Sequence, residues 1–168
     1  ESTLPLRLCY RTTVFRYEPE HAGREREIFQ VGAELIGADD VATDGEIIAL
    51  MIESLKRLGL PGFKISLGHV GFFKALLART GMSSEGRKKA EHAASKKDIP
   101  KLEEILRAER VSPMQSRIIL EAPGLYGQLE VLERGKALVG KDRELRRTLQ
   151  RLADVYLLLE ASGMKDHL

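Results

Sequence analysis

The sequence predicts an α+β fold in which an antiparallel sheet with helices is followed by an all-helical segment. Between residues 14 and 37, polar and apolar residues alternate with a period of two, which is typical of strands. After His69 the apolar residues recur at helical spacing, and no further strand is predicted. The sheet is therefore expected to come from the first part of the chain, with helices packed on one of its faces.

The stretch from Val14 to Gly37 is predicted to form a hairpin around a polar loop from Pro19 to Arg26. Upstream, residues 4–10 also alternate and predict a strand that enters the hairpin through a bend near residues 12–13. If the two arms pair, one face of the sheet is apolar and the other carries four polar side chains. These are Arg16, Glu18, Gln30 and Glu34.

A helix is predicted after the hairpin. Thr43 followed three residues later by Glu46 resembles a capping box, and Gly59 and Pro61 end the helix. Its predicted core stripe consists of Ile48, Met51, Ile52, Leu55 and Leu58. Residues 63–67 then alternate again and predict a strand that returns to the sheet.

The second half of the chain is predicted to be helical throughout. A short apolar helix contains residues 72–77, and N-cap signals follow at Ser83, Asp98 and Ser112, the last with proline next to it. The region after residue 123 is interrupted by Gly124, Gly127, Gly135 and Gly140. A long last helix is expected from about Asp142 to Ser162, with a buried stripe of Leu145, Leu149, Leu152, Val155, Tyr156 and Leu159.

Composition indicates a soluble globular protein, with 168 residues, 43% hydrophobic and 31% charged. The formal net charge of +2 is too small to imply a nucleic-acid partner. A single cysteine, Cys9, excludes an internal disulfide and suits the reducing cytoplasm. No apolar run approaches the roughly 18 residues of a membrane span. The four histidines lack metal-ligand spacing, so no metal is assigned.

The polar face of the hairpin is the main candidate site. Arg16 can hold a carboxylate or phosphate through a two-pronged hydrogen bond. Gln30 and Glu34 can accept hydrogen bonds from an ammonium group or an imidazole N–H. The alternative is an ordinary cross-strand ion pair on a solvated face, which contributes under about 1 kcal/mol. The pattern alone leaves both interpretations open.

Two other groups of basic residues have the same two interpretations. Arg24 and Arg26, in the hairpin loop, either close on an anionic ligand or are ordinary exposed loop charges. The basic residues at 87–89 and 96–97 either dock an acidic partner or form a solvated helix face.

The segments VFRYE, GRERE and FQVGAELIG resemble the second signature motif of class II aminoacyl-tRNA synthetases, most closely the histidyl branch. The resemblance implies a class II synthetase-like sheet. It implies that Arg16 contacts the amino-acid carboxylate and the α-phosphate, and that Glu18 serves the nucleotide side. Gln30 and Glu34 would hold histidine. Arg24 matches an arginine that contacts the triphosphate.

Further segments are similar to a non-catalytic branch of this family, the regulatory subunits of the short-form ATP phosphoribosyltransferases. These are LPLRLCY, AELIGADD, EIIALMIESLKRLGL, KISLGHVGFFKALL, YGQLEVLERGKAL and LADVYLLLEASG. The resemblance implies no catalysis and no cofactor, a hetero-oligomer with the catalytic subunit, a dimer of the full-length protein, and histidine as the feedback ligand. The alternatives are a working histidyl-tRNA synthetase and a helical interaction fragment with a relic pocket.

The sequence departs from the family pattern in several places. Ile28 stands where synthetases have a phenylalanine that contacts adenine, which weakens the case for ATP binding. The family's first and third motifs and its Arg-Gly-Leu-Asp-Tyr-Tyr segment are absent. The chain is therefore expected to be a fragment, with residues 1–70 as part of the class II core, 71–163 as a helical insertion with a return helix, and 164–168 as the start of the next part of the core.

Overall fold

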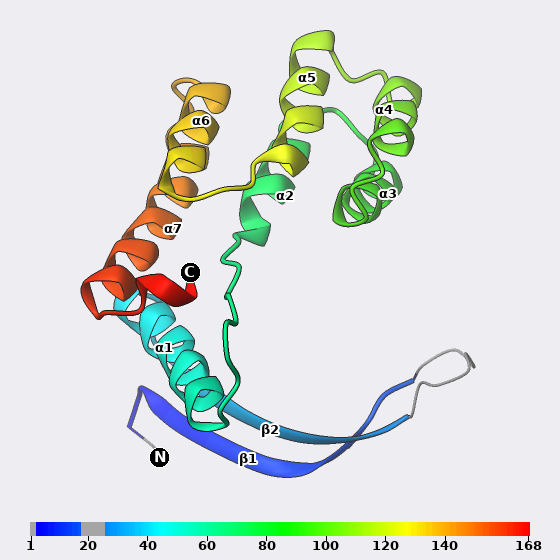
Figure 1. Cartoon of the computed structure of the whole chain (residues 1–168). Helices are drawn as coiled ribbons and strands as arrows, with labels where there is room; N and C mark the ends of the chain where they lie inside the picture. Colours follow the sequence, from blue (N-terminus) through cyan, green and yellow to red (C-terminus); the bar gives the residue numbers. More distant parts are fainter. Residues whose placement is uncertain (1–2, 18–25) are drawn as a thin grey trace. The chain divides into compact units, whose positions relative to one another are not determined.

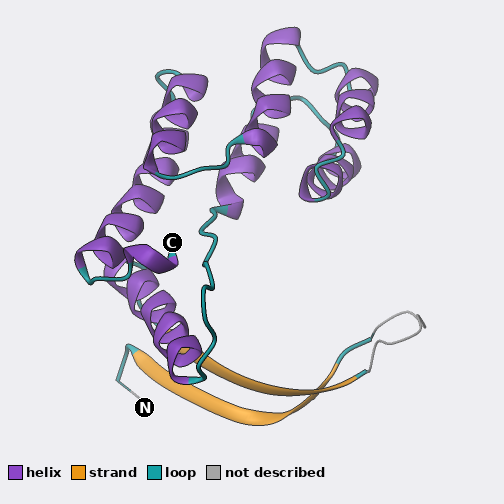
Figure 2. Cartoon of the chain, in the orientation of Figure 1, coloured by secondary structure: helices purple, strands orange, loops and turns teal. Residues whose placement is uncertain are grey.

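The computed structural model describes residues 3–17 and 26–168 (Figure 1). They divide into two compact units, the first comprising residues up to Phe63 with His167, and the second Lys64–Asp166 with Leu168. The strands lie in the first unit and most helices in the second (Figure 2), so the predicted α+β class is confirmed. The elements are β1 (Leu6–Phe15), β2 (Glu27–Ile36), α1 (Val41–Arg57), α2 (Val70–Ala78), α3 (Ser84–Ser95), α4 (Ile99–Ala108), α5 (Pro113–Glu121), η1 (Ala122–Gly124), α6 (Leu129–Val139), α7 (Arg143–Ala161) and η2 (Lys165–His167).

The first strand of the hairpin is longer than predicted and contains no bend. Strands β1 and β2 pair antiparallel without interruption, from Leu6 opposite Ile36 to Phe15 opposite Glu27. The bend expected near residues 12–13 is absent, so that prediction is wrong. Two adjacent threonines are β-branched and suit a strand interior, which explains why the strand continues through them.

Helix α1 begins one turn earlier than the capping-box pattern indicated. Asp40 is the N-cap, and its Oδ1 accepts a hydrogen bond from the Thr43 N–H at 2.7 Å. Glu46 is therefore free to receive both nitrogens of Arg7, with Nε–Oε1 at 2.5 Å and Nη2–Oε2 at 2.8 Å. This two-pronged ion pair connects α1 to β1 within the first unit.

The predicted core stripe of α1 is only partly correct. Ile52 is fully buried, whereas Met51 and Leu58 are exposed. Helical spacing identifies the side of a helix that is apolar, but it does not fix how much of that side is covered by other elements.

The strand predicted at residues 63–67 does not form. The side chains do alternate, since Phe63, Ile65 and Leu67 are half-buried while Lys64 and Ser66 are exposed. The backbone nevertheless pairs with no other strand in the part of the chain that the structure describes. A strand requires a hydrogen-bonded neighbour, so alternation alone was insufficient evidence.

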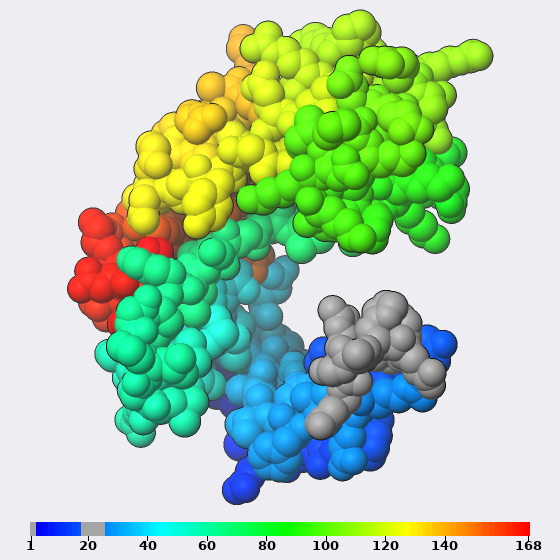
Figure 3. All heavy atoms as spheres, turned by 45° about the vertical axis from the view of Figure 1, so that its right-hand side comes forward, coloured from blue at the N-terminus to red at the C-terminus, as the bar shows by residue number. Residues whose placement is uncertain are grey.

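The second unit packs its helices around one apolar core, and the spheres of α4 and α5 adjoin in Figure 3. The predicted N-caps are confirmed: Ser83 accepts from Gly86 N–H, Asp98 from Lys101 N–H and Ser112 from Gln115 N–H. The buried core residues are Phe72, Leu76, Leu77, Met82, Ala90, Ala93, Leu102, Ile105, Leu106, Ile119, Val131, Leu132, Val139, Leu145, Leu149 and Ala153.

Helix α6 contains a glycine that acts in packing. Gly135 was expected to interrupt the chain, but it lies inside the helix and is buried. A Cβ atom added to it would lie 3.1 Å from Cδ1 of Leu149 on α7. Glycine here therefore allows the two helices to approach closely.

The long last helix, α7, has the predicted extent, with Asp142 as its N-cap and Ser162 as its C-cap.

A cluster of charged residues connects the end of α2 to the start of α7. Arg79 donates from Nε and Nη2 to the two carboxylate oxygens of Asp142, at 2.5 and 2.9 Å. Its Nη2 also lies 2.9 Å from Glu144 Oε2. Asp142 Oδ1 in addition accepts the Leu145 N–H at 3.0 Å, so one carboxylate caps α7 and holds α2. This group, Arg79, Asp142 and Glu144, is called the α2–α7 clasp below.

Replacing Asp142 by alanine is expected to destabilise the second unit by about 1–2 kcal/mol, because the helix loses its cap and Arg79 loses its main partner. Asp142→Asn is the matched control, since asparagine still caps a helix but carries no charge. Urea unfolding of the protein that contains this chain measures both. A loss as large in Asp142→Asn as in Asp142→Ala would contradict a capping contribution.

The clasp also predicts a pH dependence. The hydrogen bond from Arg79 and, next, the one from the Leu145 N–H hold the pKa of Asp142 below its ordinary value. A carboxyl whose pKa is lowered on folding stabilises the folded state above its unfolded pKa, about 3.9. This stabilisation is lost as the pH falls from there through the folded pKa. The difference in unfolding free energy between the wild type and Asp142→Asn is therefore expected to shrink at acid pH.

Candidate functional site

The pairing of β1 and β2 gathers polar side chains on one face of the hairpin, called the polar face below. Tyr10 lies opposite Gly32 and Thr12 opposite Gln30. Pairing extends one residue beyond the ladder, where the Arg16 N–H donates to the Arg26 carbonyl at 2.9 Å. Because alternate residues share a face, Tyr10, Arg16 and Gln30 lie on the same side.

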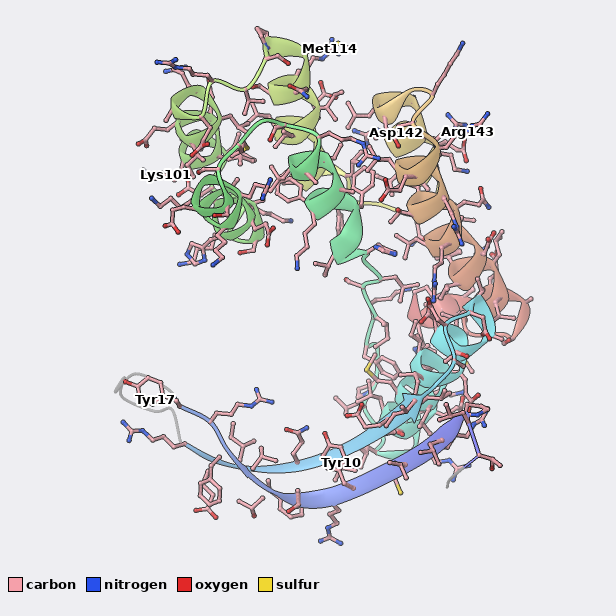
Figure 4. The ribbon with its side chains drawn as sticks, turned by 180° about the vertical axis from the view of Figure 1, so that it is seen from behind. Tyr10, Tyr17, Lys101, Met114, Asp142 and Arg143 are labelled. Carbon is pink, nitrogen blue, oxygen red and sulfur yellow. The ribbon has the colours of Figure 1, made fainter. Side chains whose placement is uncertain are left out.

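Three of these side chains form a continuous hydrogen-bonded chain. Arg16 Nη2 donates to Gln30 Oε1 at 3.3 Å. Gln30 Nε2 donates to the Tyr10 hydroxyl at 2.5 Å. With an arginine on one side and a phenol on the other, the orientation of the half-buried Gln30 amide is determined by its neighbours. Figure 4 labels Tyr10 on the hairpin.

Gly32 makes this arrangement possible. The Tyr10 ring lies directly over it, and a Cβ atom at this position would collide with the ring and its hydroxyl. Any side chain at residue 32 would therefore displace Tyr10 and break its hydrogen bond with Gln30. Gly32, between Gln30 and Glu34 on β2, therefore leaves the room that the Tyr10 ring occupies.

Glu34 lies further along the same face, opposite Leu8. Its carboxylate is exposed and forms no hydrogen bond or ion pair with the rest of the described chain. Gln30 and Glu34 are four residues apart on one strand, about 13 Å between Cα atoms at roughly 3.3 Å per residue. Gly32 lies between them on the same face, and the Tyr10 ring covers it.

The chemistry of the polar face suits a small zwitterion. The guanidinium of Arg16 supplies donors for a carboxylate, and the carboxylate of Glu34 accepts from a cation or an imidazole N–H. The amide of Gln30 lies between them in sequence and offers its acceptor oxygen on the Arg16 side. The positive group, Arg16, and the negative group, Glu34, thus lie on either side of Gln30. A ligand with a carboxylate at one end and N–H donors at the other matches this order.

The remaining predicted site residues have different outcomes. Glu18 and Arg24 lie outside the described residues. The Arg26 guanidinium carbon lies 5.9 Å from the centroid of the Tyr17 ring. Ile28 is half-buried opposite Val14. The binding roles of all these residues, like those of Arg16, Gln30 and Glu34, stay predictions.

Tyr10 is the site residue that sequence reasoning missed. The expected bend at residues 12–13 separated it from the hairpin and grouped it with apolar residues upstream. Counting in steps of two from Arg16 back through Thr12 would have placed Tyr10 on the polar face. The signal was therefore available, because nothing at residues 11–13 breaks a strand.

The opposite face of the hairpin is exposed and only partly apolar, because β1 places Arg7 opposite Leu35 and Arg11 opposite Val31 on it. The exposed fractions are 76% for Phe15, 62% for Phe29 and 71% for Val31. The Arg11 guanidinium carbon lies 5.3 Å from the Phe29 ring centroid, a cation–π contact.

Residues 3–17 and 26–168 contain neither a membrane-spanning helix nor a metal-ligand cluster. None of their helices combines the length and the apolar character that crossing a membrane requires. No group of three or more His, Cys, Asp or Glu side chains within the described ranges could hold a metal ion.

Comparison with known proteins adds independent information. Residues 1–168 match a family model described as histidyl-tRNA synthetase. A relative from Geobacter sulfurreducens, named ATP phosphoribosyltransferase regulatory subunit, is 38% identical over 165 residues, which are 98% of this chain and 37% of that protein. A relative of the same name from Caldanaerobacter subterraneus is 34% identical over 168 residues, covering 100% of this chain and 44% of that protein.

A solved structure has the same fold. It is an ATP phosphoribosyltransferase regulatory subunit/histidyl-tRNA synthetase from Bacillus halodurans, with a TM-score of 0.86 and 29% identity. The match covers 98% of this chain and 42% of that one. The chain thus spans less than half the length of these relatives.

Proposed function

This chain belongs to the histidyl-tRNA synthetase family, and from that premise we propose that it is part of a regulatory subunit of ATP phosphoribosyltransferase, in histidine biosynthesis. The names of relatives 33–38% identical over nearly the whole chain support this. In this proposal the subunit is non-catalytic, lies in the cytoplasm, forms a dimer and assembles with the catalytic subunit. Residues 1–70 belong to the class II core, 71–163 to a helical insertion, and 164–168 to the next part of the core.

The polar face is proposed to be one wall of a histidine pocket. The Arg16 guanidinium would hold the ligand's carboxylate, and Gln30 and Glu34 would bind its amino and imidazole nitrogens. The observation that carries this is the hydrogen-bonded chain from Arg16 through Gln30 to Tyr10, which holds a donor and an acceptor in place before a ligand arrives. Pre-organised groups of this kind reduce the ordering cost of binding.

Glu18, Arg24 and Arg26 are proposed to face a phosphate or nucleotide. The second candidate function is a working histidyl-tRNA synthetase, which the family model and the Bacillus relative's double name favour. A synthetase requires an adenine platform, and Ile28 offers no ring on which adenine could stack. This difference supports the regulatory role over the catalytic one.

Regulation by histidine requires that histidine bind the inhibited assembly more tightly than the active one. Because such coupling is reciprocal for binding free energies, the catalytic subunit should also change the affinity of this protein for histidine. The pocket and the partner surface must therefore be connected through a change in conformation or assembly.

The test uses calorimetry with the full protein that contains this chain. Histidine is expected to bind, and to lower the turnover of the catalytic subunit in the reconstituted complex. Arg16→Ala is expected to weaken histidine binding at least about tenfold, since a charge-assisted contact contributes roughly 1.5–3 kcal/mol. Arg57→Ala, an exposed arginine at the end of α1, is the control.

Four results would oppose the proposal. Histidine that fails to bind, or that binds without changing the partner's turnover, would exclude a sensor. Histidine-dependent exchange of pyrophosphate into ATP would favour the synthetase instead. Equal histidine responses in Arg16→Ala and the wild type would show that the polar face is a relic.

A further inference from the structure

The helical unit contains a groove that the proposed function does not use. It encloses about 1020 Å³, between the segment that precedes α2 and helices α2, α3, α6 and α7. Pockets that hold small molecules have volumes of roughly 300–1,000 Å³, so the groove has room for a ligand larger than an amino acid. All of its lining residues belong to the second unit, and none belongs to the polar face of the hairpin.

The groove offers aromatic surface for a flat ligand. Phe72 and Phe73 of α2 line it, the first buried and the second half-buried. Tyr126 also lines it and is 77% exposed. Lys97 directly follows the C-cap of α3 and has a positive φ of 54°. Its Nζ lies 5.6 Å from the Tyr126 ring centroid. An exposed aromatic ring beside a cation at a groove favours stacking of an electron-rich ring system.

The groove also contains positive charge that no carboxylate of residues 3–17 or 26–168 neutralises. Lys74 of α2 and Lys88 of α3 are exposed lining residues, and neither pairs with a carboxylate anywhere in the described chain. Among the lysines outside the groove, Lys89 pairs with Glu85 and Lys101 with Glu104. Two unpaired ammonium groups from neighbouring helices suit a phosphate, which accepts from several donors.

Two glutamates line the groove, and Glu130 already accepts the Gln128 N–H at 3.0 Å. Glu91 of α3 is half-buried, lines the groove and has no hydrogen-bond donor in the part of the chain that is described. It would repel a simple anion, but it can accept from the N–H groups of an amino-bearing ring. Phosphate at one end and an aminated aromatic ring at the other satisfy both features.

From these observations we propose that the groove binds a nucleoside monophosphate with an exocyclic amino group on its base. Lys74 and Lys88 hold the phosphate, Tyr126 stacks on the base, and Glu91 accepts from its amino group. This site is independent of the histidine pocket proposed on the hairpin.

The test titrates AMP into the full protein that contains this chain and follows the heat of binding. AMP is expected to bind with Kd below about 1 mM, and adenosine and ribose 5-phosphate each at least about tenfold more weakly. Lys74→Glu/Lys88→Glu is expected to weaken AMP binding at least about tenfold. The matched control is Lys96→Glu/Lys101→Glu, which makes the same change in total charge outside the groove and should leave Kd unchanged.

Two further variants test the roles of Tyr126 and Glu91. Tyr126→Ala should weaken AMP about tenfold without affecting ribose 5-phosphate. Glu91→Gln should reduce the preference for AMP over IMP, which has no amino group on its base. Arg16→Ala should leave AMP binding intact, so the loss of histidine binding and the loss of AMP binding are separable. Absence of AMP binding at millimolar concentration, or equal binding by both double variants, would overturn the proposal.

Discussion

Leu102→Ala is expected to destabilise the helical unit by about 2–5 kcal/mol. Leu102 lies on α4 with 0% of its surface exposed, within the apolar core of the second unit. The substitution removes buried methyl groups and leaves a cavity that surrounding side chains fill only in part. A domain whose total stability is roughly 5–15 kcal/mol would lose a large fraction of it.

The measurement is urea unfolding, with amide hydrogen exchange in α3 to α5 as a local probe. Met114→Ala serves as the control: Met114, labelled on α5 in Figure 4, is also apolar, but 77% of its surface is exposed. That variant should change the unfolding free energy by no more than about 0.5 kcal/mol. Equal losses in the two variants would show that α4 does not pack as described.

Gly32→Val is expected to lower histidine affinity by about tenfold to a hundredfold, if the polar face binds histidine as proposed. The new side chain must displace the Tyr10 ring, and Gln30 then loses the hydrogen bond that orients its amide. A hydrogen bond to a pre-positioned group contributes roughly 1–3 kcal/mol, which corresponds to this range of affinity. Calorimetry with histidine measures the effect.

A double-variant comparison separates this mechanism from simple misfolding. In a Tyr10→Ala background the ring is gone, so Gly32→Val should cause little further loss. Valine favours strands more than glycine does, and unfolding should therefore show no large loss of stability. Gly81→Ala, where an added Cβ meets no atom within 4 Å, is the control for glycine substitution. Additive losses from Tyr10→Ala and Gly32→Val would contradict the steric mechanism.

Local signals in the sequence predicted the helical unit well. An N-cap depends on a side chain and a backbone N–H three residues later, and Ser83, Asp98 and Ser112 were identified on that basis. Thr43 was mistaken for the cap of α1 because Asp40, three residues earlier, satisfies the same rule. When two possible N-cap residues lie three positions apart, the packing of the helix determines which one is used. A local sequence pattern contains no information on that packing.

Features that depend on distant residues were predicted less well. Whether residues 63–67 form a strand depends on a neighbouring strand, and whether Gly135 ends a helix depends on Leu149 on another element. In the candidate site, the shared face of Arg16, Gln30 and Glu34 followed from period two alone. Tyr10 required knowledge that β1 continues unbroken to Leu6. The role of Gly32 required the position of the Tyr10 ring.

The α2–α7 clasp has a consequence for folding kinetics. Most helix pairs of the second unit are neighbours in sequence, such as α3 with α4 and α6 with α7, and such local contacts form quickly. Arg79 and Asp142 are 63 residues apart in sequence, so their contact closes a long loop and is expected to form late, after the transition state. Loss of the clasp in Asp142→Ala should then accelerate unfolding while hardly slowing refolding, which stopped-flow kinetics would detect. The ion pair would act mainly to prolong the lifetime of the folded unit.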